Sequence, residues 1–314
     1  MFESVSPPRR DAAQQLLGFV PYLLGYHPTD ALVAVFNQAD RSTRHTVCLP
    51  LGEPAEALLE HLSLRMPSRT TTGVVLIGYG PADASEKITA VGEVLQLMLP
   101  VLGRFLYSDG VLSCLTPQCS CPASTGLCVD PRDTRIAAEL AVAGRVALPS
   151  PQALYAQVAA DPVAQAQTQA ALDALGDGLQ PTWAEGKSLM GPARGGEQLT
   201  AEQAARLCAG LRDPDVLVDV WHHTAGRMWQ HDLWFDLTRR APDGYVAAPA
   251  NLAAWCAWRR GRDALAAAAH DRALSAPGDG FTRLIGLILD ARLPAHRMPW
   301  PPVDLDAPPP RSRS

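Results

Sequence analysis

Short apolar runs alternate with segments of helical periodicity through the first third of the chain, and this alternation is the strongest constraint on its fold. The runs Ala31–Phe36 and Gly73–Tyr79 are continuous and short enough to be buried strands. Between and after them, apolar residues recur at helical spacing over 55–62 and 84–98. Strands interleaved with helices indicate a parallel or mixed sheet with helical cover. We therefore expect an α/β domain over residues 11–148 with a sheet of about five strands.

The second half of the chain has the signals of helix starts. Capping side chains stand directly before a proline, or three residues before a glutamine in a capping-box pattern. These sites are Asp130-Pro131, Ser150-Pro151, Asp161-Pro162, Asp213-Pro214 and Thr200-Ala-Glu-Gln203. The stretch 176–196 is rich in Gly and Pro and reads as a long loop. We predict an all-helical domain over 149–298 and a disordered Pro-rich tail over 299–314.

A cysteine cluster follows a predicted β-hairpin. Asp109-Gly110 favours the positive φ angles of a tight turn between strands at 104–108 and 111–115. The second strand of this hairpin runs directly into the cysteines. Four of the seven cysteines of the chain lie within fifteen residues, namely Cys114, Cys119, Cys121 and Cys128. Such density in one loop is typical of a metal site, a redox element or a stapled loop.

The spacing of this cluster leaves its chemistry open. Four thiols are enough for a tetrahedral Zn²⁺ site, and Pro117, Pro122 and Gly126 are turn formers that a zinc knuckle requires. The step Cys119-x-Cys121 is tighter than the usual knuckle, so both thiolates reach one ion only if Ser120 bulges outward. The alternatives are a loop of partly buried, inert thiols, and a redox or disulfide role.

Two further groups of polar residues are candidates for chemistry. His27 and Asp30 lie between a helix and the first buried strand, where they could line a cleft at the sheet edge. They could equally turn and cap the chain. Asp219 and His223 stand four residues apart on a predicted helix, so the carboxylate could orient the imidazole. A surface ion pair is the favoured interpretation of that second pair.

Composition and charge exclude some classes of function. The net charge is −5, and nearly all positive charges are arginines because Lys87 and Lys187 are the only lysines. A nucleic-acid-binding role is therefore not expected. The first ten residues lack the apolar core of a signal peptide, and no apolar run is long enough to span a membrane. We expect a cytoplasmic protein whose thiols stay reduced.

Three segments together resemble the family known as domain of unknown function 4192, found mainly in high-GC Gram-positive bacteria. They are Leu16–Val33, with its Gly25-Tyr-His-Pro-Thr-Asp30 sequence, the cysteine segment, and Trp234–Leu289. The resemblance spans nearly the whole chain and implies an architecture but no known activity. The family pattern has one cysteine and then an adjacent Cys-Cys-Pro. Here Ser120 separates Cys119 from Cys121, and Cys128 is an addition.

The segment Asn251–Asp279 also resembles a single tetratricopeptide unit. Small and apolar residues stand near that repeat's positions, including Ala254, Gly261, Ala266 and Ala273. The physical logic is a pair of antiparallel helices packed closely through alanines. Because one unit does not make a solenoid, a helical hairpin docked on its own protein is favoured over a peptide-binding array.

These observations lead to two hypotheses about function. The first is a cytoplasmic, non-catalytic interaction or regulatory protein, whose possible partner is another protein and whose possible cofactor is a structural zinc ion at Cys114, Cys119, Cys121 and Cys128. It rests on the absence of a catalytic constellation, a full cofactor motif and a basic field in the sequence. The alternative is an enzyme of unknown reaction with a site near His27, Asp30 and the cysteine loop. A pocket that joins those residues would favour the enzyme.

Overall fold

The computed structural model describes residues 10–38, 44–66, 71–119, 121–176, 183–277, 279–291 and 295–300. The chain divides into two compact units, Met1–Pro151 and Gln152–Ser314. The predicted tail over 299–314 lies outside the described residues from 301 onward. No helix in the described segments is long and apolar enough to cross a membrane.

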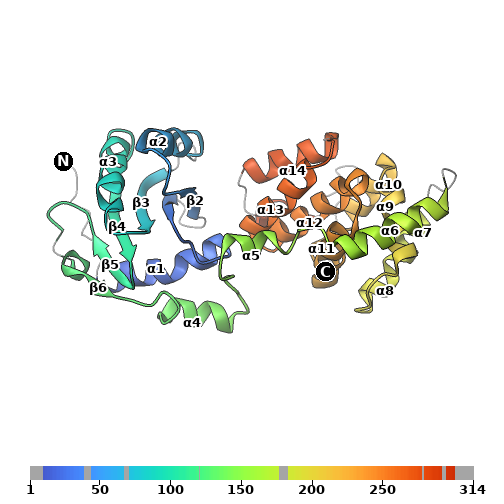
Figure 1. Cartoon of the computed structure of the whole chain (residues 1–314), viewed down its shortest axis with the longest axis horizontal. Coiled ribbons are helices and arrows are strands. Elements are labelled where there is room, and N and C mark those ends of the chain that lie inside the picture. Colours follow the sequence, from blue (N-terminus) through green and yellow to red (C-terminus); the bar gives the residue numbers. More distant parts are fainter. Residues whose placement is uncertain are drawn as a thin grey trace, which may run out of the picture. The chain divides into compact units, whose positions relative to one another are not determined.

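The first unit is built on one mixed sheet (Figure 1). Within the described residues it has six strands in the order β2-β1-β3-β4-β5-β6. The strands are β1 (Ala31–Gln38), β2 (Arg44–Pro50), β3 (Thr71–Tyr79), β4 (Val101–Ser108), β5 (Val111–Cys114) and β6 (Leu127–Cys128). Strands β3 and β4 are parallel, and the other neighbouring pairs are antiparallel. The prediction of a mixed sheet is confirmed, with one strand more than expected.

Helices cover both faces of this sheet, which explains why its central strands are apolar throughout. Helices α2 (Ala55–Leu64) and α3 (Ala84–Gln96) pack on one face, and α1 (Arg10–Leu24) packs on the other (Figure 1). In β1, Leu32 and Phe36 enter the core under α2 and α3, whereas Val33 enters the core under α1. Side chains of successive strand residues point to opposite faces, so the apolar residues of β1 contribute alternately to the two cores.

The predicted turn at Asp109-Gly110 is confirmed. The two residues have φ angles of 49° and 80°, and Ser108 pairs with Val111 across the hairpin formed by β4 and β5. Positive φ at both central positions matches the twist of the flanking strands. Strand β5 runs antiparallel to β4 and ends at Cys114, the residue at which the cysteine loop begins.

The order of the strands gathers several strand ends at one edge of the sheet. The crossover from β3 through α3 to β4 brings the carboxyl ends of both parallel strands to that edge. Since β1 runs antiparallel to β3, Ala31 pairs with Tyr79 and the segment that enters β1 lies at the same edge. In α/β folds, ligands bind in crevices outside the carboxyl ends of parallel strands.

Helix α1 contains Pro21 in its interior, although a proline usually interrupts a helix. The helix continues through Pro21 to Leu24, and Gly25 follows it with a φ of 78°. Leu17 and Val20 on its inner face are fully buried against the sheet. Burial of that apolar face keeps the last turn helical beyond a residue that lacks the backbone N–H.

The second unit is helical, as predicted. From residue 151 onward the helices are α5 (Pro151–Tyr155), α6 (Pro162–Leu175), α7 (Trp183–Leu189), α8 (Gly191–Arg194), α9 (Ala201–Gly210), α10 (Pro214–His222), α11 (Met228–Arg240), α12 (Ala247–Arg259), α13 (Asp263–Leu274) and α14 (Gly280–Asp290). Short 3-10 turns lie at Asp243–Tyr245 and Ala295–Arg297. The expected long loop over 176–196 is wrong where α7 and α8 form. Helices α12 and α13 pack through alanines such as Ala254 and Ala266, which are fully buried.

Candidate functional site

The loop between β5 and β6 carries the cysteines, and its backbone turns bring three of them together. Cys114 ends β5, and the Leu115 N–H donates to the Arg104 carbonyl across the sheet (2.8 Å). Gln118 adopts a left-handed φ of 56°, which reverses the chain directly before Cys119. Cys121 then precedes the short 3-10 helix η1 (Pro122–Thr125), which leads into β6.

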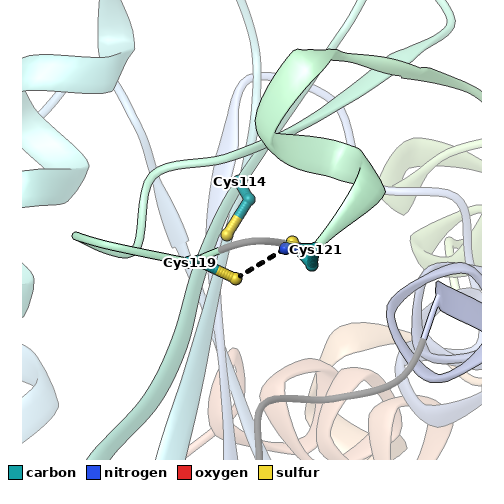
Figure 2. Close-up of side chains that lie close together, drawn as sticks. All are labelled: Cys114, Cys119 and Cys121. Carbon is teal, nitrogen blue, oxygen red and sulfur yellow. Dashed lines mark hydrogen bonds between the residues drawn. The ribbon is translucent and has the colours of Figure 1, made fainter.

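The sulfurs of Cys114, Cys119 and Cys121 lie within 4.8 Å of one another (Figure 2). The Cys121 backbone N–H also donates to the Cys119 sulfur at 3.4 Å, so one residue of the set holds another in place. Cys121 is buried, while Cys114 and Cys119 are half-buried at the edge of the core under α1. Ser120, the residue expected to bulge between two ligands, lies outside the described residues.

Hydrogen bonds among the three thiols separate their pKa values. Burial raises the pKa of Cys119, but hydrogen bonds from the Cys121 thiol, the Cys121 N–H and the Cys114 thiol outweigh it, and the net pKa is lowered. Burial, together with its bonds to the neighbouring sulfurs, raises the pKa of Cys121 to about 12. The arrangement therefore favours the thiolate form at Cys119 over that at Cys121.

The donor set fits a thiophilic metal ion. Zinc–sulfur bonds of about 2.3 Å in a tetrahedral site place the sulfurs about 3.8 Å apart, so the three sulfurs would close in by at most about 1 Å. These three cysteines could hold a metal ion.

Cys128 is not part of this group. It lies on β6, is exposed, and pairs with Val111 at the start of β5. Val111 and Cys114 are three residues apart on one strand, which places Cys128 about 10 Å along the sheet from Cys114. The structure thus brings together three of the four cysteines that the sequence singles out, and it takes the fourth elsewhere.

Cys128 instead lines a pocket of about 610 Å³ in the same unit. His27, the other candidate residue from the sequence, lies on its wall too. Asp30 is not among the lining residues. It is exposed with a left-handed φ of 47°, and its carbonyl accepts the Leu51 N–H at 2.8 Å, so its backbone makes the turn into β1.

Four other polar residues line the pocket that sequence reasoning did not identify. They are Tyr79, Tyr107, Asp130 and Arg132. A signal was available for the tyrosines, because they stand at the carboxyl ends of β3 and β4, where α/β folds place ligands. No such signal marks Asp130 and Arg132, because an aspartate followed by a proline, as in Asp130-Pro131, is typical of a helix start. The helix α4 (Arg135–Val142) begins later, with Thr134 accepting the Ala137 N–H.

The environment of the pocket favours the neutral forms of His27, Tyr79 and Tyr107. Burial lowers the pKa of His27, the nearby Arg132 lowers it further, and Asp130 partly opposes both. Burial raises the pKa of Tyr107, with Asp130 adding to this effect and Arg132 opposing it. Burial also raises the pKa of Tyr79 well above its ordinary value, with contributions from Cys48 and Tyr107. At neutral pH the imidazole is neutral and both phenols keep their protons.

The pair Asp219 and His223 has a simpler arrangement than a dyad. The His223 ring nitrogen lies 2.7 Å from the backbone oxygen of Asp219, one turn earlier along the helix. The imidazole thus caps the end of α10 by a local contact with the main chain, and nothing in this geometry points to catalysis.

The fold and the site define an α/β unit with a three-cysteine centre, followed by a helical unit. A family model for a domain of unknown function, DUF4192, matches residues 14–296, so the chain belongs to that family. No curated protein and no solved structure matches the chain.

Proposed function

We propose that this chain is a non-catalytic interaction or regulatory protein of the cytoplasm whose cysteine loop is fixed by a structural zinc ion. The observation that carries the zinc is the convergence of the sulfurs of Cys114, Cys119 and Cys121. Thiolates are soft ligands that select zinc over the harder cations magnesium and calcium. The loop ends in a strand of only two residues, Leu127–Cys128, so its backbone pairing to the sheet is short. A metal ion would supply the fixation that this pairing lacks.

The helical unit supports the interaction role. The sequence of Asn251–Asp279, which covers most of α12 and α13, resembles one tetratricopeptide unit, a module whose arrays bind proteins. Its buried alanines allow close helix packing. Next to it, α14 carries Leu284 and Leu287, which are 39% and 61% exposed and stand three residues apart on the helix. Because contiguous apolar surface marks protein contacts, these two leucines are the place on α14 where a substitution tests the interaction role.

Metal analysis of the full-length chain tests the zinc. Protein purified without added zinc is expected to contain one zinc ion per chain, measured by elemental analysis. Replacing Cys114, Cys119 or Cys121 singly with Ser should lower the zinc content, because each change removes one of three thiolate ligands. Cys128→Ser is the matched control, since it alters a cysteine of the same segment outside the group, and it should keep its zinc.

Two results would contradict this assignment. One is substoichiometric zinc in the wild-type chain with all thiols reactive toward a thiol reagent. The other is a loss of zinc in Cys128→Ser as large as that in Cys121→Ser, which would mean that the ligands are not the three convergent cysteines.

An enzyme of unknown reaction is the second candidate, and one observation favours it. The pocket joins His27 to Cys128 of the cysteine segment, although Asp30 does not line it. Incubating the wild-type chain and His27→Ala with a metabolite extract separates the two hypotheses. Turnover of a metabolite by the wild type alone would support the enzyme. The interaction role predicts no turnover. It also predicts a protein partner that the wild type and His27→Ala bind equally and that Leu287→Asp does not bind.

A further inference from the structure

The pocket of the first unit stands at the place where the topology of the sheet favours a ligand. Tyr79 is the last residue of β3, and Tyr107 is next to the last of β4. Both line the pocket, together with His27 from the segment that enters β1. Its volume of about 610 Å³ falls within the range of small-molecule sites, roughly 300–1,000 Å³. None of the three convergent cysteines lines it, so this site is separate from the proposed zinc centre.

The walls of the pocket are stiff and partly apolar. The rings of Tyr79 and Tyr107 meet edge to face, with their centroids 5.9 Å apart. The Tyr107 hydroxyl donates to the Val129 carbonyl at 3.0 Å, which fixes that ring. Pro21 and Pro28 contribute further apolar surface with a restricted backbone. Such walls suit an apolar or aromatic group that enters a largely preformed site.

Two opposite charges come from one turn on the wall. The Asp130 side chain accepts the Arg132 N–H at 2.9 Å, and the Asp130 carbonyl accepts the Asp133 N–H at 3.0 Å. Asp130 raises the pKa of both His27 and Tyr107, and Arg132 lowers the pKa of both. The two charges are therefore close enough to act on the same region of the pocket. Among the ion pairs in the described part of the chain, neither Asp130 nor Arg132 takes part.

The charges on the pocket lining balance. Asp130 and Arg132 cancel, and His27 is neutral at pH 7. A polyanion such as a nucleotide would be repelled by Asp130, and the lining has no surplus of positive charge to compensate. A cation would likewise be repelled by Arg132. A molecule with one charge of each sign satisfies both residues at once.

We propose that this pocket binds a free amino acid or a dipeptide as a zwitterion. The carboxylate pairs with the Arg132 guanidinium, whose planar fork matches its two oxygens. The ammonium group pairs with Asp130. The apolar part of the ligand packs against the Tyr107 ring, which the buried Tyr79 ring contacts edge to face. In an interaction or regulatory protein, such a site would make partner binding respond to the supply of amino acids or peptides.

Binding measurements on the full-length protein test this assignment. The probes are the twenty common L-amino acids and a set of glycyl dipeptides, screened by thermal shift and confirmed by calorimetry. The probe that binds best is then compared with its N-acetylated form, which lacks the ammonium group, and its amide, which lacks the carboxylate. AMP serves as the anionic probe. We expect at least one zwitterion to bind, and both blocked forms to bind about tenfold or more weakly.

Single substitutions assign each end of the ligand. Arg132→Gln and Asp130→Asn should each weaken binding of the zwitterion about tenfold or more. Asn keeps a side-chain oxygen for the Arg132 N–H, so the turn is preserved. Arg132→Gln should not weaken the amide further, and Asp130→Asn should not weaken the N-acetyl form further. The matched control is Arg135→Gln, because Arg135 is exposed, pairs with Glu139 on α4 and does not line the pocket.

Three outcomes would overturn the proposal: no zwitterion binds, binding survives both pocket substitutions unchanged, or AMP binds better than every zwitterion. Zinc content is measured on the same samples and should be equal in the wild type and the pocket variants. A failure of the zinc assignment is thereby distinguished from a failure of this one.

Discussion

At the scale of single residues, Tyr79 has an uncompensated polar atom. Its side chain is 3% exposed, and its buried hydroxyl has no hydrogen-bond partner among the described residues. Tyr107, beside it, donates its hydroxyl to the Val129 carbonyl. A buried hydroxyl that is left unpaired costs about 1–3 kcal/mol, whereas a satisfied hydrogen bond contributes about 1 kcal/mol. The two tyrosines therefore predict opposite effects of the same substitution.

Tyr79→Phe should leave the free energy of unfolding unchanged or raise it by about 1 kcal/mol, because it removes only the unpaired hydroxyl. Tyr107→Phe is the matched control and should lower the free energy of unfolding by about 1 kcal/mol. Urea denaturation followed by circular dichroism measures both. A larger loss of stability in Tyr79→Phe than in Tyr107→Phe would show that the Tyr79 hydroxyl has a partner in solution.

Residue patterns predicted part of the candidate site. The density of cysteines pointed to Cys114, Cys119 and Cys121, whose sulfurs converge. It could not separate them from Cys128, because that distinction depends on the two-residue strand β6 and its pairing with Val111. The charged wall of the pocket was beyond prediction for a similar reason. Its charged residues belong to a turn that only the tertiary structure brings near His27.

At the scale of elements, local signals predicted most strands and several helix starts. The apolar runs and the Asp109-Gly110 turn were reliable because burial on both faces and positive φ angles leave few alternatives. Prolines were less reliable. Pro162 and Pro214 begin helices behind capping aspartates, but Pro131 lies in a turn and Pro21 lies inside α1. In α1, packing against the sheet outweighs the local penalty of the proline.

The capping box of α9 makes a quantitative prediction at this scale. The Thr200 hydroxyl accepts the Gln203 N–H at 3.2 Å, and the Gln203 side chain accepts the Thr200 N–H at 2.9 Å. Thr200 is exposed, so Thr200→Ala removes the cap with little loss of packing. We expect it to lower the free energy of unfolding of the helical unit by about 1 kcal/mol, measured by urea denaturation.

Thr200→Ser is the control for this cap, because serine keeps the hydroxyl and should retain nearly the full stability. If Thr200→Ser and Thr200→Ala were equally destabilised, the threonine methyl group would account for the effect, and the capping bond would contribute nothing measurable.

At the scale of the whole molecule, the two compact units contain different residues whose signals report unfolding. All seven tryptophans lie in the second unit, since the first of them is Trp183. Trp234 and Trp255 are almost fully buried there. The three convergent cysteines lie in the first unit. Tryptophan fluorescence therefore follows the unfolding of the second unit alone, whereas calorimetry follows both.

This division predicts a selective effect of metal removal. A ligand present at a hundred times its Kd stabilises the folded state by about 2.7 kcal/mol. In a unit of about 150 residues, 1 kcal/mol shifts the unfolding midpoint by about 2–4 °C. Stripping the zinc with a strong chelator should then lower one calorimetric transition by about 5–11 °C and leave the midpoint of the tryptophan fluorescence unchanged.

The same measurement on Cys121→Ser provides the control for this prediction. That variant should unfold at the lowered temperature before any chelator is added, and it should not respond to the chelator, because it lacks one of the convergent thiols. Adding zinc back should restore the calorimetric transition of the wild type and not that of the variant. A chelator-induced shift in the tryptophan midpoint as large as that of the calorimetric transition would contradict this account.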